Sequence, residues 1–487
     1  MTGSTQRLIY LGLGLAVLAI SVRILNNWRD GFYMFIFWLL FEDLVRKYMG
    51  NNMAIYFGKD FLVGITYLSF FLAIRRHQVQ AFRPPFLVSL LVLVWVGLAQ
   101  VFNPNSPSVL YGVLGLKLYF YYAPLMFVGY AIIQTEEDLR HFLVFNMGLA
   151  GIIGLLGIIQ SIVGFSFLNP QVLAPDIQEL GSLTRKAPIT GEIVMRPSSV
   201  FVSDGRFAAY MILMFIVGMG AAGYLLLRTH KGRKIVFPAI ALAAVAGVMS
   251  GSRGAFIFIG ASTALLSAGM LWGAPLGRRE RGRLINALRR SATLIALALF
   301  LVFLVFPEDI SARWFLYSET LSPDSPSYEL GARVWTYPVN ELTKAFDNPH
   351  WFWGNGIGTA SLGMQYVSRL MGVRMSEIGV ESGYGDIVLE LGIFGLFVWL
   401  FWTIALVKAG WKVVHKLRET CYFPVALAIL WFAFILLFLE TFGGIQAFQN
   451  YINNAYLWLL LGILFRLPAL AAYSAGTPSS NMINHAT

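Results

Sequence analysis

The residues best suited to chemistry in this sequence lie in one long interval, from Pro307 to Ile387. Arg333 stands near its middle, and two carboxylates, Glu381 and Asp386, stand where the sequence becomes apolar again. Tyr384 follows Glu381 by three positions, so on a helix the two side chains would share one face. A guanidinium binds phosphate oxygens in pairs, and a carboxylate can take a proton from a hydroxyl. These residue types suit chemistry on an anionic substrate.

The composition determines where such a site would be. Of the 487 residues, 57% are hydrophobic and 13% charged, whereas soluble proteins have about 25% charged residues. The chain is therefore expected to be an integral membrane protein. Its net charge of +11 comes mostly from short loops, where Lys and Arg set topology, so no nucleic-acid partner is expected. The single cysteine, Cys421, excludes an internal disulfide.

Apolar segments of membrane-spanning length occur nearly from end to end. They predict an all-α polytopic membrane protein with about 12–13 transmembrane helices and a large outward-facing loop between the tenth and eleventh. The candidates are 8–24, 31–48, 60–74, 86–102, 109–133, 142–163, 207–227, 235–250, 254–273, 291–306, 384–407, 420–440 and 452–466.

Four basic clusters orient these segments, because Lys and Arg favour short cytoplasmic loops. The clusters lie at 75–83, 228–234, 278–290 and 408–418, and the helices counted between them place all four on one side. Loops 164–206 and 307–383 would then face outward. The expected divisions are a first transmembrane part, 1–306, the outer loop 307–383, a second transmembrane part, 384–466, and a flexible cytoplasmic tail, 467–487.

Five cations fall on the outward side, against the usual bias: Lys117, Arg196, Arg206, Arg253 and Arg333. A cation near the apolar part of a bilayer is costly unless it is paired or solvated. Together they predict an anionic partner at that face.

Three of these cations also have a structural interpretation. Arg206 could extend to the interface, and Arg196 could be an ordinary solvated loop residue. Lys117 could form a buried pair with a carboxylate such as Glu42 or Glu440.

Three aromatic residues and a glycine turn in the large loop allow two interpretations. Trp335, Trp351 and Trp353 could stack on the rings of a ligand or anchor the loop in the membrane interface. Gly354–Gly358 could approach a ligand closely, although a simple turn is the better interpretation. Glu390 is expected to brace a helix contact rather than do chemistry.

The order of four stretches resembles the O-antigen ligase and O-antigen polymerase superfamily of membrane glycosyltransferases. The stretches are Arg196-Pro-Ser-Ser-Val-Phe201 with Asp204 to Tyr210, Ser252-Arg-Gly-Ala255, Gly331-Ala-Arg-Val-Trp335 with Asn348-Pro349 and the glycine turn, and Glu381-x-x-Tyr384 with Glu390-Leu-Gly392 and Gly395. The segment Glu42 to Lys47, with Lys59-Asp60, is similar to members devoted to exopolysaccharide.

This resemblance implies a donor glycan on a polyprenyl diphosphate, such as undecaprenyl diphosphate. Arg253 and Arg333 would hold the diphosphate, assisted by Lys117, Arg196 and Arg206. The resemblance also gives Glu381 a role in activating the acceptor hydroxyl, with Tyr384 beside it.

Family ligases carry a histidine and an asparagine where this chain has Glu381 and Ser382. This departure favours a polymerase, and it leaves His350 in the same loop as an alternative base. Neither an Asp-x-Asp pair nor a histidine cluster is present in the sequence, so no metal and no cofactor are expected.

The expected function is polymerisation of lipid-linked repeat units into a surface polysaccharide, either exopolysaccharide or O-antigen. The site would face outward from a bacterial cytoplasmic (inner) membrane. One alternative is a ligase that passes the glycan to a lipid A-core or other acceptor, and another is a transporter or flippase of an anionic lipid-linked substrate. Membrane lipid, a chain-length regulator and a flippase are the expected partners.

Overall fold

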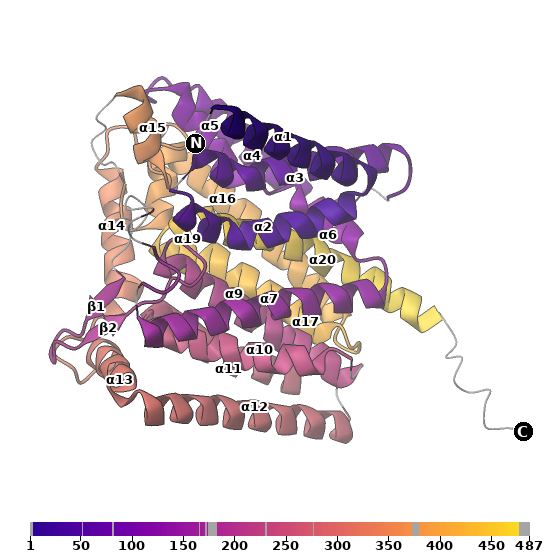
Figure 1. Ribbon diagram of the computed structural model, residues 1–487, viewed down its shortest axis with the longest axis vertical. Coiled ribbons are helices and arrows are strands. Elements are labelled where there is room, and N and C mark those ends of the chain that lie inside the picture. Colours follow the sequence, from indigo (N-terminus) through magenta and orange to yellow (C-terminus); the bar gives the residue numbers. More distant parts are fainter. Residues whose placement is uncertain are drawn as a thin grey trace, which may run out of the picture.

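The computed structural model describes residues 3–50, 52–79, 82–164, 166–170, 173, 183–228, 231–275, 277–372 and 379–476. Within these residues the chain is a bundle of long helices with a single two-stranded hairpin at one end (Figure 1).

The elements fall into two sets. The helices that run along the bundle are α1 (Gly3–Asn26), α2 (Trp28–Tyr48), α3 (Met53–Arg75), α4 (Leu87–Val101), α5 (Val109–Phe120), α6 (Leu125–Ile132), α7 (Glu136–Val163), α9 (Asp204–Leu227), α10 (Arg233–Met249), α11 (Arg253–Trp272), α12 (Arg278–Val305), α16 (Gly383–Lys416), α17 (Phe423–Phe434) and α20 (Tyr451–Gly476). The shorter elements are β1 (Thr184–Lys186), β2 (Ile193–Met195), α13 (Pro307–Leu321), η1 (Ala332–Thr336), α14 (Tyr337–Phe346), α15 (Met364–Met371), η2 (Ile435–Glu440), α18 (Thr441–Gly443) and α19 (Gln446–Gln449).

Eight helices in the described part of the chain are long and apolar enough to cross a membrane. The chain is therefore an all-α polytopic membrane protein, and this prediction is confirmed. The other predicted segments are also helical, as α1, α2, α4, α10 and α12. Helices α4 and α10 have only 15 and 17 residues, and α2 and α12 carry several charges. Helix α20 continues to Gly476, past the expected end at 466, and residues 477–487 of the expected tail lie outside the described residues.

The centre of the bundle is α9, whose spanning window is 89% buried. Small residues let its neighbours approach closely, as is common where helices pack in membranes. A Cβ added at Gly220 would lie 2.6 Å from the Cβ of Ala428 on α17. A Cβ added at Gly462 of α20 would lie 2.0 Å from the carbonyl oxygen of Met126 on α6.

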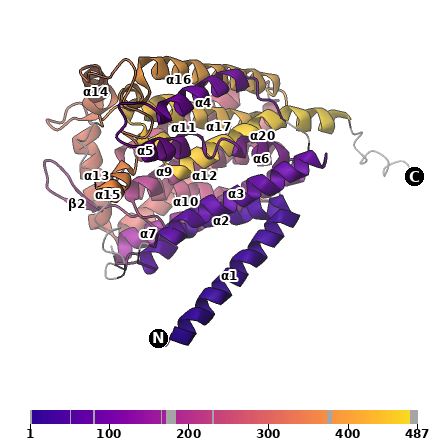
Figure 2. The ribbon, with the colours of Figure 1, turned by 90° about the horizontal axis from the view of Figure 1, so that it is seen from above.

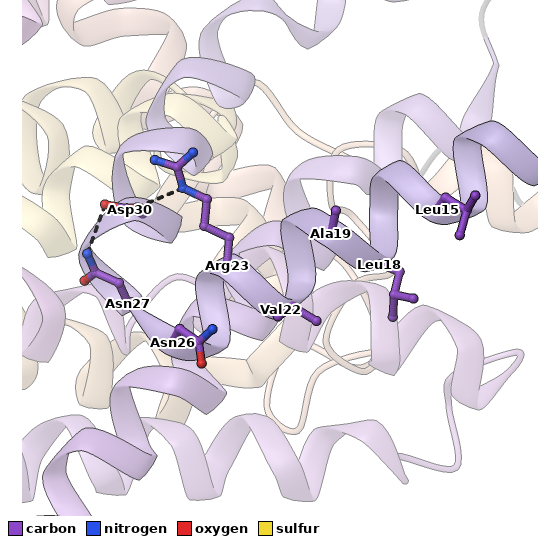
Figure 3. A pocket seen from close by; sticks show the side chains of 8 residues that line it. All are labelled: Leu15, Leu18, Ala19, Val22, Arg23, Asn26, Asn27 and Asp30. Atoms are coloured by element: carbon purple, nitrogen blue, oxygen red, sulfur yellow. Dashed lines mark hydrogen bonds and ion pairs between the residues drawn. The ribbon is translucent and has the colours of Figure 1, made fainter.

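The first helix lies at the edge of the bundle. Figure 2 shows α1 leaning away from the other helices. Near its end Arg23 donates to Asp30 of α2 at 2.9 Å, beside an open hollow that Leu15, Leu18 and Val22 help to line (Figure 3). The hollow adjoins the junction between α1 and α2, and none of its lining residues is a predicted site residue.

The two ends of the bundle differ in chemistry. One end, called the loop end here, carries the hairpin, α13, α14 and α15 (Figure 1). The basic clusters gather at the opposite end: Arg228 pairs there with Glu136 at 3.0 Å, and Arg418 donates to the carbonyl of Gly273. Loops 164–206 and 307–383, so far as they are described, therefore lie opposite the basic clusters.

Candidate functional site

Three of the predicted site residues, Arg253, Arg333 and Glu381, lie together at the loop end, and Glu329 links the two arginines. Arg253 Nη1 donates to Glu329 Oε2, and Arg333 Nε lies 3.6 Å from the same oxygen. Arg333 Nη1 also donates to Glu381 Oε2 at 3.4 Å. The four side chains form a continuous sequence of ion pairs, Arg253–Glu329–Arg333–Glu381. We call its first three residues the open bridge.

Local backbone structure explains the position of Arg253. Ser252 caps α11 and accepts a hydrogen bond from the backbone N–H of Ala255 at 3.3 Å, so Arg253 is the first residue of the helix. Gly251 before it has a φ of +64°, which glycine adopts without strain. A Cβ added at Gly251 would lie 3.3 Å from Cγ of Arg196, so Arg196 passes close to this turn.

Exposure increases steadily along the ion pairs. The side chains of Arg253 and Glu329 are 12% and 35% exposed, and those of Arg333 and Glu381 are 51% and 72% exposed. Exposed pairs contribute little to stability because water screens them. The arrangement therefore has one anchored arginine and increasingly accessible groups beyond it, where a solute can reach them.

Glu329 was missed in the sequence, although it precedes Arg333 by four positions, a spacing that favours an ion pair on a helix. Burial acts to raise the pKa of this carboxyl. The hydrogen bond from Arg253 and the charges of Arg253, Arg333 and Arg185 outweigh burial, and the pKa of Glu329 lies below its ordinary value. Glu329 is therefore ionised at neutral pH.

Arg185 on strand β1 is another cation that the sequence did not single out. Burial, followed by the nearby charges of Arg253 and Arg196, lowers the pKa of Arg185 to about 10. Like charges shift a pKa in this way only at short range. Arg185 therefore adds to the positive potential around Arg253.

Two buried side chains of α13 hold the hairpin against α13 and the end of α10. Arg313 on α13 is 2% exposed and donates to the carbonyls of Met249 and Met195, each at 3.0 Å. Glu319 accepts backbone hydrogen bonds from Ile189 at 2.6 Å and Thr190 at 3.1 Å. These contacts join α10, α13 and the hairpin, and so fix where Arg185 and Arg196 lie.

Arg196 is paired rather than simply solvated. Its guanidinium forms an ion pair with Asp204, the first residue of α9, and its side chain is 20% exposed. The structure therefore differs from the solvated alternative for Arg196.

Arg206 and Lys117 belong to a second group of charges. Arg206 Nη1 donates to Asp43 at 2.8 Å, and Asp43 also accepts from Arg46 at 2.9 Å and from the hydroxyl of Tyr451 at 2.9 Å. We call Arg46–Asp43–Arg206 the sealed bridge, because the Asp43 side chain is 0% exposed.

Lys117 lies near the sealed bridge but pairs with another acid. It donates to Asp60 at 2.5 Å, so Glu42 and Glu440 were the wrong candidate partners. Glu42 instead accepts from Lys59 at 2.7 Å. The five cations expected to share one anion thus divide between two groups.

Tyr384 and Glu381 do not share a helical face as predicted. Helix α16 begins at Gly383 with Ser382 as its cap, so Glu381 precedes the helix. The backbone N–H of Glu381 donates to the Glu341 carboxylate of α14 at 3.2 Å, so Glu381 is held against α14. Tyr384 instead packs its ring 5.9 Å from that of Phe442.

His350 belongs to a different part of the loop. Its backbone N–H donates to Asn348 Oδ1 at 2.9 Å, and its carbonyl accepts from Gly354 at 2.6 Å. The His350 side chain is exposed, and no contact described in the structure joins it to the open bridge. The geometry therefore favours Glu381 over His350 as the group beside the cations.

The glycine turn is structural. Residues 354–358 are buried, and a Cβ added at Gly358 would lie 1.9 Å from the carbonyl oxygen of Tyr111 on α5. Glu390 of α16 accepts from Ser361 at 2.7 Å and Tyr119 at 2.9 Å, and so holds the segment after the turn against α5. This agrees with a bracing role for Glu390.

Asp386 accepts a backbone hydrogen bond from Val380 at 3.2 Å and is 4% exposed.

The described residues contain no group of three or more His, Cys, Asp or Glu side chains that could hold a metal ion.

The fold and these contacts define a polytopic membrane protein with a charged site at one end of its helical bundle. Comparisons of the chain with models of protein families and with curated proteins gave no match.

Proposed function

We propose that this chain is a membrane glycosyltransferase that polymerises polyprenyl-diphosphate-linked repeat units into a surface polysaccharide. The observation that carries the proposal is the position of Arg333, which contacts Glu329 on one side and Glu381 on the other. A cation group suited to a diphosphate is thereby joined to a carboxylate suited to an acceptor hydroxyl.

In this mechanism Arg253 and Arg333 bind the diphosphate of the donor, with Arg185 and Arg196 adding positive potential. The acceptor hydroxyl oxygen attacks the anomeric carbon of the donor sugar from the face opposite the diphosphate. The bond from that carbon to the diphosphate oxygen breaks, and its electron pair leaves with the lipid diphosphate. Preorganised guanidinium groups stabilise the charge that develops there. The hydroxyl proton passes to Glu381.

The site would face outward from a bacterial cytoplasmic membrane, since the basic clusters lie at the other end and favour the cytoplasm. A ligase would use the same cations and the same donor, and it differs only in its acceptor. A transporter would instead place charges along a path near the middle of the membrane. The accessible open bridge at the loop end favours chemistry over transport.

The direct experiment supplies purified protein in lipid nanodiscs with the lipid-linked repeat unit extracted from the bacterium that encodes it. A ladder of products without a second acceptor supports the polymerase. One transfer that requires an added glycolipid indicates the ligase, and no product with either contradicts both. The reaction is run with and without EDTA to test its independence of metal. Arg23→Ala is the matched control for Arg253→Ala, because Arg23 is a paired arginine in a different part of the bundle.

A further inference from the structure

Three aromatic rings form a row beside the Arg333–Glu381 pair. The ring centroids of Trp335 and Phe442 are 6.0 Å apart, and those of Phe442 and Tyr384 are 5.9 Å apart. Trp335 comes from η1, Phe442 from α18 and Tyr384 from the first turn of α16. Segments distant in the sequence thus supply one aromatic row.

Close backbone packing fixes this row. A Cβ added at Gly383 would lie 2.0 Å from the carbonyl oxygen of Thr441, so α16 and α18 touch where Tyr384 and Phe442 begin. Trp335 is 67% exposed, whereas Phe442 and Tyr384 are half-buried. The row therefore runs from the half-buried rings of Tyr384 and Phe442 to the solvent-exposed ring of Trp335.

Polar groups border the same row. Arg333 lies on η1 with Trp335, Glu381 lies just before α16 with Tyr384, and Arg333 Nη1 donates to Glu381 Oε2 at 3.4 Å, so one ion pair joins the two elements that carry the ends of the row. The guanidinium of Arg333 lies 5.1 Å from the ring of Tyr337, and Glu341 accepts from the backbone N–H of Glu381 at 3.2 Å. A sugar ring has an apolar C–H face and a rim of hydroxyls, which match an aromatic face and charged hydrogen-bond partners respectively. A lipid chain has no polar groups that could form hydrogen bonds with Arg333 and Glu381.

We propose that Trp335, Phe442 and Tyr384 form a saccharide subsite that holds the acceptor sugar against Glu381. This rests on the proposed function, since it assigns the sugar-binding part of that same site. Trp335 supplies the outer stacking face, and Phe442 sets the position of the inner rings. Phe442 lies outside every motif of the sequence analysis, and Tyr384 here binds the sugar rather than exchanging a proton.

The alternative role for exposed tryptophans is anchoring in the membrane interface. The chain offers a matched control: Trp353 at the same end is 65% exposed and packs on Phe352 and Phe394. Trp335→Leu retains an apolar side chain and removes the aromatic face. Trp335→Phe keeps an aromatic face and should retain binding.

The probe is the oligosaccharide released by mild acid from the lipid-linked repeat unit, which lacks both lipid and diphosphate. Binding to protein in nanodiscs is measured by saturation-transfer difference NMR. With the wild-type protein we expect saturation to be transferred from the protein to the C–H protons of one sugar of the probe. Binding should be about five- to tenfold weaker in Trp335→Leu and in Phe442→Ala. It should be unchanged in Trp353→Leu, and thermal unfolding of each variant verifies its folding.

Two outcomes overturn the subsite: no transfer to the wild type, or equal binding by Trp335→Leu, Phe442→Ala and Trp353→Leu. Arg253→Ala separates this inference from the proposed function, because the probe carries no diphosphate and should still bind. Selective loss in the Trp335 and Phe442 variants, with no polymer made by the wild type, would sustain the subsite and refute the polymerase. A polymer ladder made by the wild type, with equal binding of the probe by all variants, would sustain the polymerase and refute the subsite.

Discussion

Two arginine–carboxylate–arginine bridges in the described part of the chain differ in their surroundings. In the sealed bridge Asp43 is 0% exposed between Arg46 and Arg206, and the Tyr451 hydroxyl also donates to it. In the open bridge Glu329 is 35% exposed between Arg253 and Arg333. A buried charge is costly to leave unpaired, whereas an exposed carboxylate can exchange for another anion. The carboxylate of the sealed bridge is therefore enclosed by protein, whereas the carboxylate of the open bridge is accessible to solvent.

Breaking the sealed bridge should have the largest effect on stability. Asp43→Asn removes the only negative charge of that bridge, and loss of one partner of a buried pair costs about 3–5 kcal/mol. We expect a large fall in the free energy of unfolding, measured by chemical denaturation in detergent. Glu329→Gln is the matched change in the open bridge and should cost less than about 1 kcal/mol. Similar losses from both variants would contradict the distinction.

Breaking the open bridge should mainly affect catalysis. Removing a preorganised donor to developing charge costs about 100-fold or more in rate, so Arg253→Ala should lower polymer formation at least that far. Arg253→Lys should recover only part of the rate, because an ammonium lacks the planar fork. Product ladders and thermal unfolding are measured together. A normal ladder from Arg253→Ala would remove this residue from the site.

Glu329 should compete with an anionic ligand for the two arginines. Neutralising it in Glu329→Gln is expected to tighten binding of inorganic diphosphate about tenfold, equivalent to about 1.4 kcal/mol. Isothermal titration calorimetry measures this affinity in the wild type and in the variant. Weaker binding would mean that the Glu329 charge positions the arginines and does not compete.

The smallest effect is the pH dependence of stability. The folded pKa of Glu329 lies below its ordinary value, so its stabilising contribution is complete above that value and is lost as pH falls through the lowered one. Solvent screening limits the effect to less than about 1 kcal/mol. Thermal unfolding between about pH 6 and 3 should show a shallower acid limb for Glu329→Gln than for the wild type. Identical acid limbs would contradict this.

The sequence predicts the helices well and the pairings poorly. Apolar length identifies the spanning segments because each must satisfy its backbone within the bilayer. It also indicates the helix start that carries Arg253 and the long loop that carries Arg333 and Glu381. It does not separate Arg206 and Lys117 from that group, because partners such as Asp43 and Asp60 lie far away along the chain. Phe442 gives no local signal, since its role depends on contact between α16 and α18.

The most direct test compares the open bridge with the Lys117–Asp60 pair of the second charge group for binding of a lipid diphosphate. Undecaprenyl diphosphate would be titrated into purified protein in nanodiscs, with Arg253→Ala and Arg333→Ala set against Lys117→Met from the second charge group. We predict at least about tenfold weaker binding in both open-bridge variants, and near-normal binding by any Lys117→Met protein that folds. Loss of binding only in Lys117→Met, with Arg253→Ala and Arg333→Ala unaffected, would contradict the assignment of the diphosphate site.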